Sequence, residues 1–195
     1  MQEPMIIGVD EAGRGPLAGP VVAAAVLVPW SFSLSGLDDS KKLSSKKREE
    51  LEGLIKNSVI AWGVGLASVE EIDRLNILQA SLLAMRRAIA KIPNINAMVL
   101  VDGNQSPRSG HDEWPIIKGD QKVKAISAAS ILAKEARDSY MKSLALKHPE
   151  FEFEKHMGYP TSVHLAALER HGVLACHRKT FGPVAKLLPK TASKA

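Results

Sequence analysis

The sequence predicts an α/β protein, in which short strands share the chain with amphipathic helices. Short apolar runs that lead into acidic residues occur at 6–9, 97–101 and 116–117, a pattern that favours strands ending at a functional edge. Apolar residues recur with helical spacing at 72–89 and again at 123–144. Together these patterns indicate a protein built from both strands and helices.

The first expected strand, 6–9, leads into two adjacent carboxylates, Asp10 and Glu11, and then into a turn rich in glycine. Side chains alternate faces along a strand, so the two acids can share a site only if the strand ends or bulges there. Two carboxylates held close repel each other unless a hard cation such as Mg²⁺ takes up the charge. The alternative is a solvated turn with two ordinary surface acids.

Two further strands and one helix are expected before the next acid. A Val/Ala-rich run over 21–28 ends at Pro29 and predicts a buried strand, and 59–67 predicts a third strand weakened by glycine. The sequence Ser-Val-Glu-Glu at 68–71 is a capping box that opens a helix. The apolar stripe at 72–89 predicts that this helix has one continuous inward face.

Five basic residues lie within nine positions at 40–48. The second half of this segment is expected to begin a helix capped by Ser44 or Ser45, whose solvated face explains its charges. Lys41 and Lys42 precede the helix among hydroxyl residues, where side chains and backbone N–H groups can hold a phosphate.

Two more acids follow apolar runs. Asp102 ends an expected strand and precedes Gly103, although strand packing has no need of an acid there. An Asp-Gly turn is the alternative. Asp120 follows Gly119 and precedes a long helix, whose dipole it could merely stabilise. Because sites in sheet proteins gather at strand ends, Asp102 and Asp120 are candidates for one site with Asp10.

Composition narrows the classes of function. The chain is 45% hydrophobic and 24% charged, as in globular proteins, and its longest apolar run, 21–30, is too short to cross a bilayer and lacks the features of a secretory signal. The single Cys176 excludes an internal disulfide framework and suits a reducing cytoplasm. A net charge of +5 favours a polyanionic partner, though many basic proteins have none. Four histidines and the cysteine between 156 and 177 match no common zinc spacing.

Seven short motifs, taken in their order along the chain, resemble the ribonuclease HII family, the bacterial type 2 ribonucleases H. They are VDEAGRGPL at 9–17, DSKKLS at 39–44, LNIL at 75–78, VDGN at 101–104, KGD at 118–120, ISAASILAK at 126–134 and GYPT at 158–161. Each motif is weak alone, but their order across nearly the whole chain is specific.

The resemblance implies a ribonuclease H-like fold, a mixed sheet of about five strands flanked by helices. It implies a single catalytic domain over 1–195, with a core of about 1–150 and a helical, substrate-binding C-terminal part of about 151–195. It also implies a cytoplasmic, monomeric endonuclease of ribonucleotide excision and DNA repair, without membrane association. Its implied partners are RNA/DNA hybrids, whose RNA strand it hydrolyses, and duplex DNA containing ribonucleotides, which it cuts on their 5′ side to leave 3′-hydroxyl and 5′-phosphate ends.

The resemblance also implies a site. The family's catalytic positions fall on the four acids Asp10, Glu11, Asp102 and Asp120, which are expected to hold two Mg²⁺ or Mn²⁺ ions for two-metal hydrolysis. The glycine-rich turn is expected to sense the ribose 2′-hydroxyl, with Tyr159 near the RNA-to-DNA junction, although a half-buried tyrosine before a helix is the alternative. The expected substrate-binding residues are Gly13, Arg14, Gly15, Ser40, Lys41, Lys42, Asn76, Tyr159 and Arg178.

Two other functions stay open on the residues alone. A noncatalytic duplex-binding protein would use the same basic surface, but it would leave three acid-tipped strands, which repel phosphate, without a purpose. A nucleotide-binding phosphotransferase built on the glycine-rich turn would lack the Gly-Lys-Ser/Thr signature. The related ribonuclease HIII usually has a Glu at the last acidic position, where this chain has Asp120.

Overall fold

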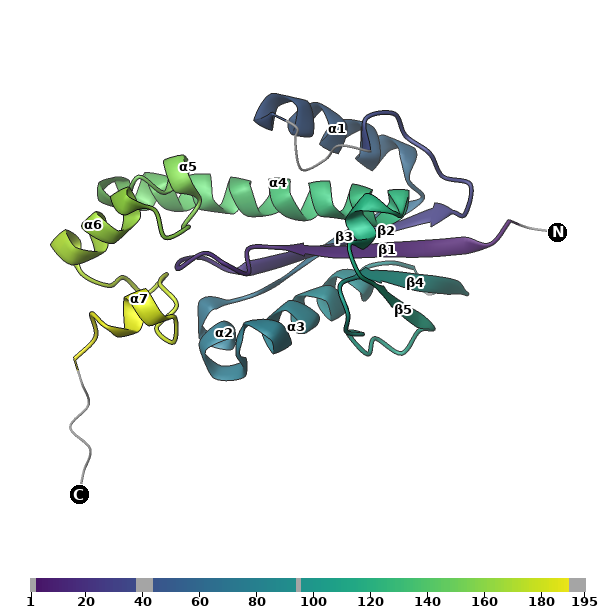
Figure 1. Cartoon of the computed structure of the whole chain (residues 1–195). Coiled ribbons are helices and arrows are strands. Elements are labelled where there is room, and N and C mark those ends of the chain that lie inside the picture. Colours follow the sequence, from purple (N-terminus) through teal and green to yellow (C-terminus); the bar gives the residue numbers. More distant parts are fainter. Residues whose placement is uncertain (1–2, 38–43, 94–95, 190–195) are drawn as a thin grey trace, which may run out of the picture.

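The computed structural model describes residues 3–37, 44–93 and 96–189. Its centre is a mixed five-stranded sheet in the order β3-β2-β1-β4-β5, flanked by helices (Figure 1). The α/β class and the mixed five-stranded sheet predicted from the sequence are therefore confirmed. The strands are β1 (Met5–Ala12), β2 (Val21–Pro29), β3 (Ala61–Ala67), β4 (Ala97–Asp102) and β5 (Glu113–Ile116). The helices are α1 (Ser45–Ser58), α2 (Val69–Leu75), α3 (Ile77–Ile89), α4 (Lys124–Lys147), α5 (Phe153–His156), α6 (Ser162–His171) and α7 (Gly182–Ala185), with short 3₁₀ turns η2 (Gly119–Gln121) and η3 (Pro149–Phe151).

Strand β1 lies at the centre of the sheet and has neighbours of both kinds. It runs antiparallel to β2 along its whole length and parallel to β4 from Met5 to Val9. Val9 is paired with Val101, so the next residues of the two parallel strands are Asp10 and Asp102. This register places two of the predicted acids side by side, at the carboxyl ends of two neighbouring strands.

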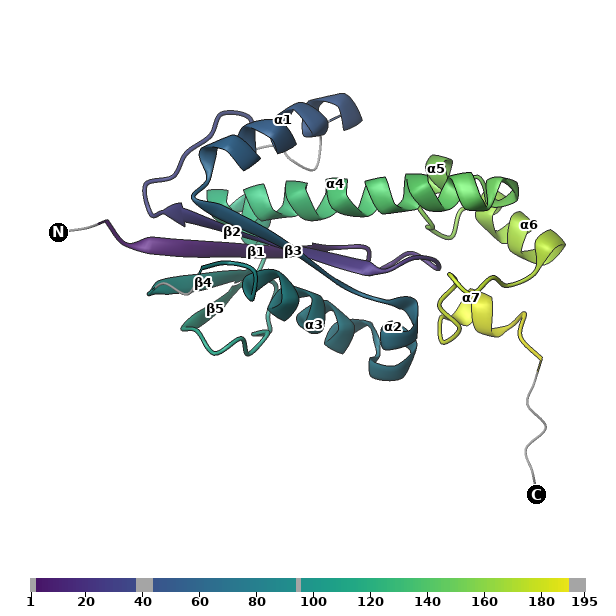
Figure 2. The same cartoon turned by 180° about the vertical axis from the view of Figure 1, so that it is seen from behind.

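Helices cover both faces of the sheet. Helices α1 and α4 lie on one face and α2 and α3 on the other, as the two opposite views show (Figures 1 and 2). Gly8 of β1 lies directly under α4, because an added Cβ would collide with the backbone of Ala125. This close crossing lets α4 carry side chains to the end of β1.

The predicted single helix after residue 68 is wrong, because the chain breaks into α2 and α3 at Asn76. This residue has φ 71° and ψ 164°, a backbone region that is essentially restricted to glycine. Its Oδ1 accepts a hydrogen bond from the N–H of Gln79 at 3.1 Å and so caps α3. The apolar stripe itself is core as predicted, since Ile72 and Ile89 are both buried.

The C-terminal part packs against the loop that follows β1. A third hydrophobic cluster joins Leu17 in this loop to Met141 of α4 and to residues of the C-terminal part, among them Phe151. The N–H of Leu17 donates to the carbonyl of Gly158 at 2.7 Å, and the N–H of Gly19 donates to that of Cys176 at 2.9 Å. The C-terminal part therefore forms one wall beside the acid-bearing end of the sheet.

Across the three described ranges, the longest helices are too polar or too short to cross a membrane.

Candidate active site

Asp10 and Glu11 stand near the end of β1. The strand continues in regular register with β2 as far as Ala12, so the prediction that it ends or bulges at the acids is wrong on this edge. On its other edge, pairing with β4 stops at Val9, because β4 itself ends at Asp102. The N–H of Glu11 donates to Oδ1 of Asp10 at 2.7 Å, which fixes the orientation of the first carboxylate.

Asp102 organises the turn that carries Asp120. Its Oδ1 accepts hydrogen bonds from the backbone N–H of Gly119 at 2.6 Å and from that of Asp120 at 3.3 Å. A Cβ on Gly119 would lie 2.6 Å from Cδ1 of Ile126 and 3.4 Å from Oδ1 of Asp102, so a larger residue here would have to displace its neighbours. The third and fourth acids are thus linked through the backbone, and the register of β1 with β4 links them to the first two.

The acids raise one another's affinity for protons. Burial, and then the charges of Glu11 and Asp102, raise the pKa of Asp10 well above its usual value, although a hydrogen bond from Ser130 opposes this. Burial also raises the pKa of Glu11, against the effect of Arg14, whose guanidinium lies 3.3 Å from its Oε1. Within the described residues, the buried Oε2 of Glu11 has no hydrogen-bond partner. A bound cation would offset the repulsion between these carboxylates and would give the unsatisfied oxygen a partner.

No finished metal cage is present in the part of the chain that the structure describes, since no three His, Cys, Asp or Glu side chains there are arranged to hold an ion. The structure brings the four acids into one neighbourhood through strand register and backbone hydrogen bonds. Their roles as metal ligands stay a prediction.

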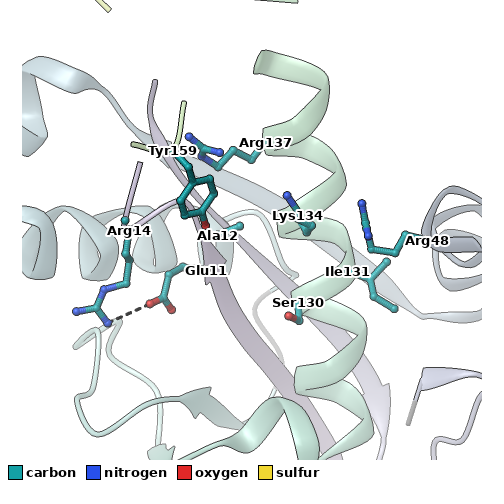
Figure 3. A pocket seen from close by; sticks show the side chains of 11 residues that line it. Glu11, Ala12, Arg14, Arg48, Ser130, Ile131, Lys134, Arg137 and Tyr159 are labelled. Carbon is teal, nitrogen blue, oxygen red and sulfur yellow. Dashed lines mark hydrogen bonds and ion pairs between the residues drawn. The ribbon is translucent and has the colours of Figure 1, made fainter. Parts of the chain in front are cut away.

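A cavity of about 410 Å³ opens beside Glu11 (Figure 3). The glycine-rich turn, with Gly13, Arg14 and Gly15, forms one part of its lining, and Tyr159 from the C-terminal part forms another. The ring of Tyr159 rests close to the turn, because a Cβ on Gly15 would lie 3.3 Å from its Cε1. Four of the predicted substrate-binding residues therefore share one cavity with an acid.

The cavity also contains residues that the sequence reasoning missed. Ser130 and Lys134 reach it from α4, and Arg48 reaches it from α1 (Figure 3). Lys134 also pairs with Asp138 at 2.6 Å, and Arg48 pairs with Glu135 at 2.7 Å. A signal existed for the first two, because a spacing of four places Ser130 and Lys134 on the same helix face. Arg48 gave no such signal, since it follows two lysines in a segment that reads as a solvated helix face.

The expectation that Arg178 contacts the substrate does not fit its position. Its side chain is fully buried, and its guanidinium donates to the carbonyls of Gly13, Arg14, Gly19 and Pro20 at 2.6 to 3.2 Å. The side chain turns inward because its own backbone is tied to the loop after β1, with the N–H of Arg178 donating to Leu17 at 2.8 Å. Arg178 therefore shapes the glycine-rich turn from below.

Arg137 holds the same loop from α4. Its guanidinium donates to the carbonyls of Ala18 at 3.1 Å, Pro20 at 3.2 Å and Met157 at 3.0 Å. Gly13 has φ 98°, and a side chain there would collide with Arg137. The two guanidinium groups fix the loop without any carboxylate partner among these contacts, so positive charge lies buried behind the turn.

The other predicted contacts lie elsewhere. Ser40, Lys41 and Lys42 fall outside the described residues. Asn76 is exposed at the junction of α2 and α3 and does not line the cavity described above.

A mixed five-stranded sheet with helices on both faces, and with carboxylates where neighbouring parallel strands end, defines an enzyme of the ribonuclease H-like class. The family described as ribonuclease HII matches residues 7–184. A ribonuclease HII of Dechloromonas aromatica is 53% identical over 94% of each chain, and one of Nitrosospira multiformis is 56% identical over 95% of this chain and 93% of that one. The crystal structure of the ribonuclease H2 from Pyrococcus horikoshii OT3 superposes with a TM-score of 0.78 at 26% identity, covering 94% of this chain and 96% of that chain. The chain belongs to the ribonuclease HII family and is a ribonuclease H, an endonucleolytic hydrolase.

Proposed function

We propose that the protein hydrolyses the RNA strand of RNA/DNA hybrids and cuts duplex DNA on the 5′ side of embedded ribonucleotides, leaving 3′-hydroxyl and 5′-phosphate ends. Family membership supports the ribonuclease H activity. The observation that carries the finer proposal is the cavity in which Glu11 lies beside the glycine-rich turn and Tyr159. There, an acid suited to chemistry at a phosphate shares one space with groups suited to reading a sugar.

The four acids fit divalent cations such as Mg²⁺ or Mn²⁺, which prefer carboxylate oxygens. The burial and the neighbouring charges that raise the pKa of Asp10, and the unsatisfied Oε2 of Glu11, both favour a cation between them. Asp10, Glu11 and Asp102 would hold two such ions, and Asp120 would complete the set and help to orient the attacking water. When bound, ions of this kind lower the pKa of water and stabilise the oxygen that leaves the phosphate.

The protein's own contacts hold these carboxylates ready. The hydrogen bonds from Gly119 and Asp120 fix the carboxylate of Asp102, and the N–H of Glu11 fixes that of Asp10. Groups that are oriented before substrate arrives need no rearrangement at the moment of reaction. The backbone of strand β1 and of the η2 turn thus preorganises the reacting site.

Recognition of ribose needs a donor or an acceptor placed against one hydroxyl group. Gly13 and Gly15 carry no side chains, so their peptide groups can approach a sugar closely. Arg178 holds the carbonyls of this turn, Arg137 holds the loop that follows it, and the ring of Tyr159, which is 45% exposed, offers an aromatic face beside it. The helical C-terminal part, which carries Tyr159, therefore contributes to substrate binding.

Phosphates of the duplex would bind to basic side chains around the cavity. Arg14, whose side chain is 53% exposed, is best placed among the described residues. Lys41 and Lys42 are proposed to act in the same way. Contacts of this kind do not read sequence, and the affinity they give falls steeply as the salt concentration rises.

A duplex with one embedded ribonucleotide tests the proposal, with an all-DNA duplex of the same sequence as the control. We expect one cut, on the 5′ side of the ribonucleotide, when Mg²⁺ or Mn²⁺ is added and none in the presence of a chelator. Equal cutting of the all-DNA duplex would overturn the proposal that the protein recognises the ribose. Binding of the duplex without cleavage in either metal would favour the noncatalytic alternative instead.

A further inference from the structure

Three buried histidines lie behind Tyr159, and the proposed chemistry does not use them. His164 and His177 have no exposed surface, and His156 is 7% exposed. The rings of His156 and His164 are stacked with their centroids 4.6 Å apart, and Phe151 and Phe153 pack around them. This histidine cluster is more ordered than apolar packing requires, because each ring nitrogen of its three members has a specific partner.

Hydrogen bonds fix the tautomers of His177 and His164. The N–H of Leu174 donates to Nδ1 of His177 at 3.0 Å, so the neutral ring of His177 must carry its proton on Nε2. That proton can only be donated to Nε2 of His164, 3.1 Å away, so His164 carries its own proton on Nδ1. Nδ1 of His164 then donates to the carbonyl of Tyr159 at 2.9 Å. These hydrogen bonds form a chain in which every donor points the same way, from Leu174 through His177 and His164 to the carbonyl of Tyr159.

His156 holds the peptide on the other side of the same residue. Its Nδ1 accepts from the N–H of Gly158 at 3.2 Å, and its Nε2 donates to the carbonyl of Phe151 at 2.9 Å. The segment needs such support, since Met157 has φ 50° and Gly158 has φ 82°, two successive left-handed residues. The N–H of Thr161 donates to the same Tyr159 carbonyl at 2.8 Å, so His164 supplies one of two bonds that orient this peptide.

We propose that His164 is a positioning residue for ribonucleotide recognition, which acts through the carbonyl of Tyr159 to set the aromatic ring against Gly15. The inference rests on the proposed function, because it assigns a role in the reading of ribose. The ring of Tyr159 is half exposed, so the direction of its Cα–Cβ bond, and therefore its backbone, decides where it lies. The bond from His164 to that backbone is partly shielded from water and is strengthened by its place in a hydrogen-bonded chain.

Two isosteric variants of His164 separate positioning from packing. In His164→Asn, the side-chain amide replaces Nδ1–H and keeps the bond to Tyr159, while the contact with His177 is lost. In His164→Gln, the amide oxygen replaces Nε2 and keeps the contact with His177, while the bond to Tyr159 is lost. Each variant loses one hydrogen bond of His164, the buried one to His177 in the Asn variant and the partly buried one to Tyr159 in the Gln variant, so both melting temperatures should fall.

The measurement is kcat/KM on a duplex with a single embedded ribonucleotide, well below both melting temperatures. We expect His164→Gln to lose roughly ten-fold, the size of one hydrogen bond, and His164→Asn to stay within about three-fold of the wild type. A double-mutant cycle adds a second readout, in which His164→Gln causes no further loss once Tyr159→Ala is present. Equal losses in the two variants, or fully additive losses in the cycle, would overturn the proposal.

A failure of the proposed function looks different. In that case the wild type itself would not cut the ribonucleotide duplex. Nitrogen chemical shifts of the imidazole rings then still test the hydrogen-bond chain, with Nδ1 of His164 and Nε2 of His177 expected to be protonated near neutral pH. The opposite tautomer of His164 would overturn the inference whatever the activity of the enzyme.

Discussion

The guanidinium of Arg178 donates to the carbonyl of Gly13 at 2.6 Å, a contact between residues 165 positions apart in the sequence. The same side chain also binds the carbonyls of Arg14, Gly19 and Pro20. One buried cation therefore ties both ends of the loop after β1 to the C-terminal part. The shape of the glycine-rich turn is set by a residue that does not reach the cavity.

Replacing Arg178 by Lys tests this relationship, because an ammonium group keeps the charge but cannot span four carbonyls in a fixed fork. We expect the free energy of unfolding to fall by about 2–4 kcal/mol, since two or more buried carbonyls lose their donor. At a temperature where the variant is folded, selectivity for the ribonucleotide duplex over all-DNA should fall. Lys179→Ala, which removes an exposed charge at the adjacent position, is the control for stability. Wild-type selectivity in the folded Arg178→Lys variant would show that the turn holds its shape without the guanidinium group of Arg178.

Replacing Asp10 by Asn should separate catalysis from stability. Burial and the charge of Glu11 raise the pKa of Asp10, so its ionised form destabilises the metal-free protein. We therefore expect the Asn variant to lose cleavage, to keep measurable duplex binding, and to melt no lower than the wild type in a chelator. Added Mg²⁺ or Mn²⁺ should raise the melting temperature of the wild type more than that of the variant. Full cleavage by the variant would remove Asp10 from the reaction.

Stability should fall on mild acidification because of the histidine cluster. Burial, and then the charges of His164 and His148, lower the pKa of His177 to about 4, and burial also lowers the pKa of His164. The unfolded chain takes up these protons from about pH 6.5 downwards, and the folded protein does not. Since the unfolded state binds more protons in this window, stability is lost as the pH falls from about 6.5 to about 4, by up to roughly 3 kcal/mol for His177.

Urea unfolding at a series of pH values checks this dependence. His177→Asn keeps an acceptor near the position of Nδ1 but removes the titrating ring, so its stability should depend less on pH in this window. An equally steep dependence in that variant would place the titrating group elsewhere.

The sequence predicted those parts of the fold and site that depend on local pattern. The Val/Ala run of β2 stands out because its residues are apolar without interruption and all of 21–28 are buried, and the apolar stripe of α2 and α3 stands out because its apolar residues recur with the period of a helix. The break at Asn76 did not, since α3 resumes one residue after α2 ends and the stripe continues across the junction. Asp102 stood out because an acid is out of place at the end of a buried strand.

What could not be predicted depends on contacts between distant segments. Arg178 lies in a basic tail that reads as surface, and only carbonyls more than 150 residues away explain its burial. His164 and His177 lie in a histidine-rich segment whose spacing matches no common zinc pattern, and their pairing depends on how α6 packs against the segment that follows it. The tautomer chain exists only after that packing, so no spacing rule could have revealed it.

Asn76 offers the last test, because substitutions can separate the effect of its backbone conformation from the effect of its side chain. Glycine suits φ 71° and ψ 164° better than asparagine does, so Asn76→Gly trades relief of backbone strain against loss of the cap on Gln79. We expect its free energy of unfolding to stay within about 1 kcal/mol of the wild type, whereas Asn76→Ala, which loses the cap without relieving the strain, should lose about 1–2 kcal/mol. Duplex affinity of the glycine variant then reports on the exposed amide alone. A weaker affinity at unchanged stability would support the predicted contact of Asn76 with substrate, and an unchanged affinity would reduce its role to shaping the junction of α2 and α3.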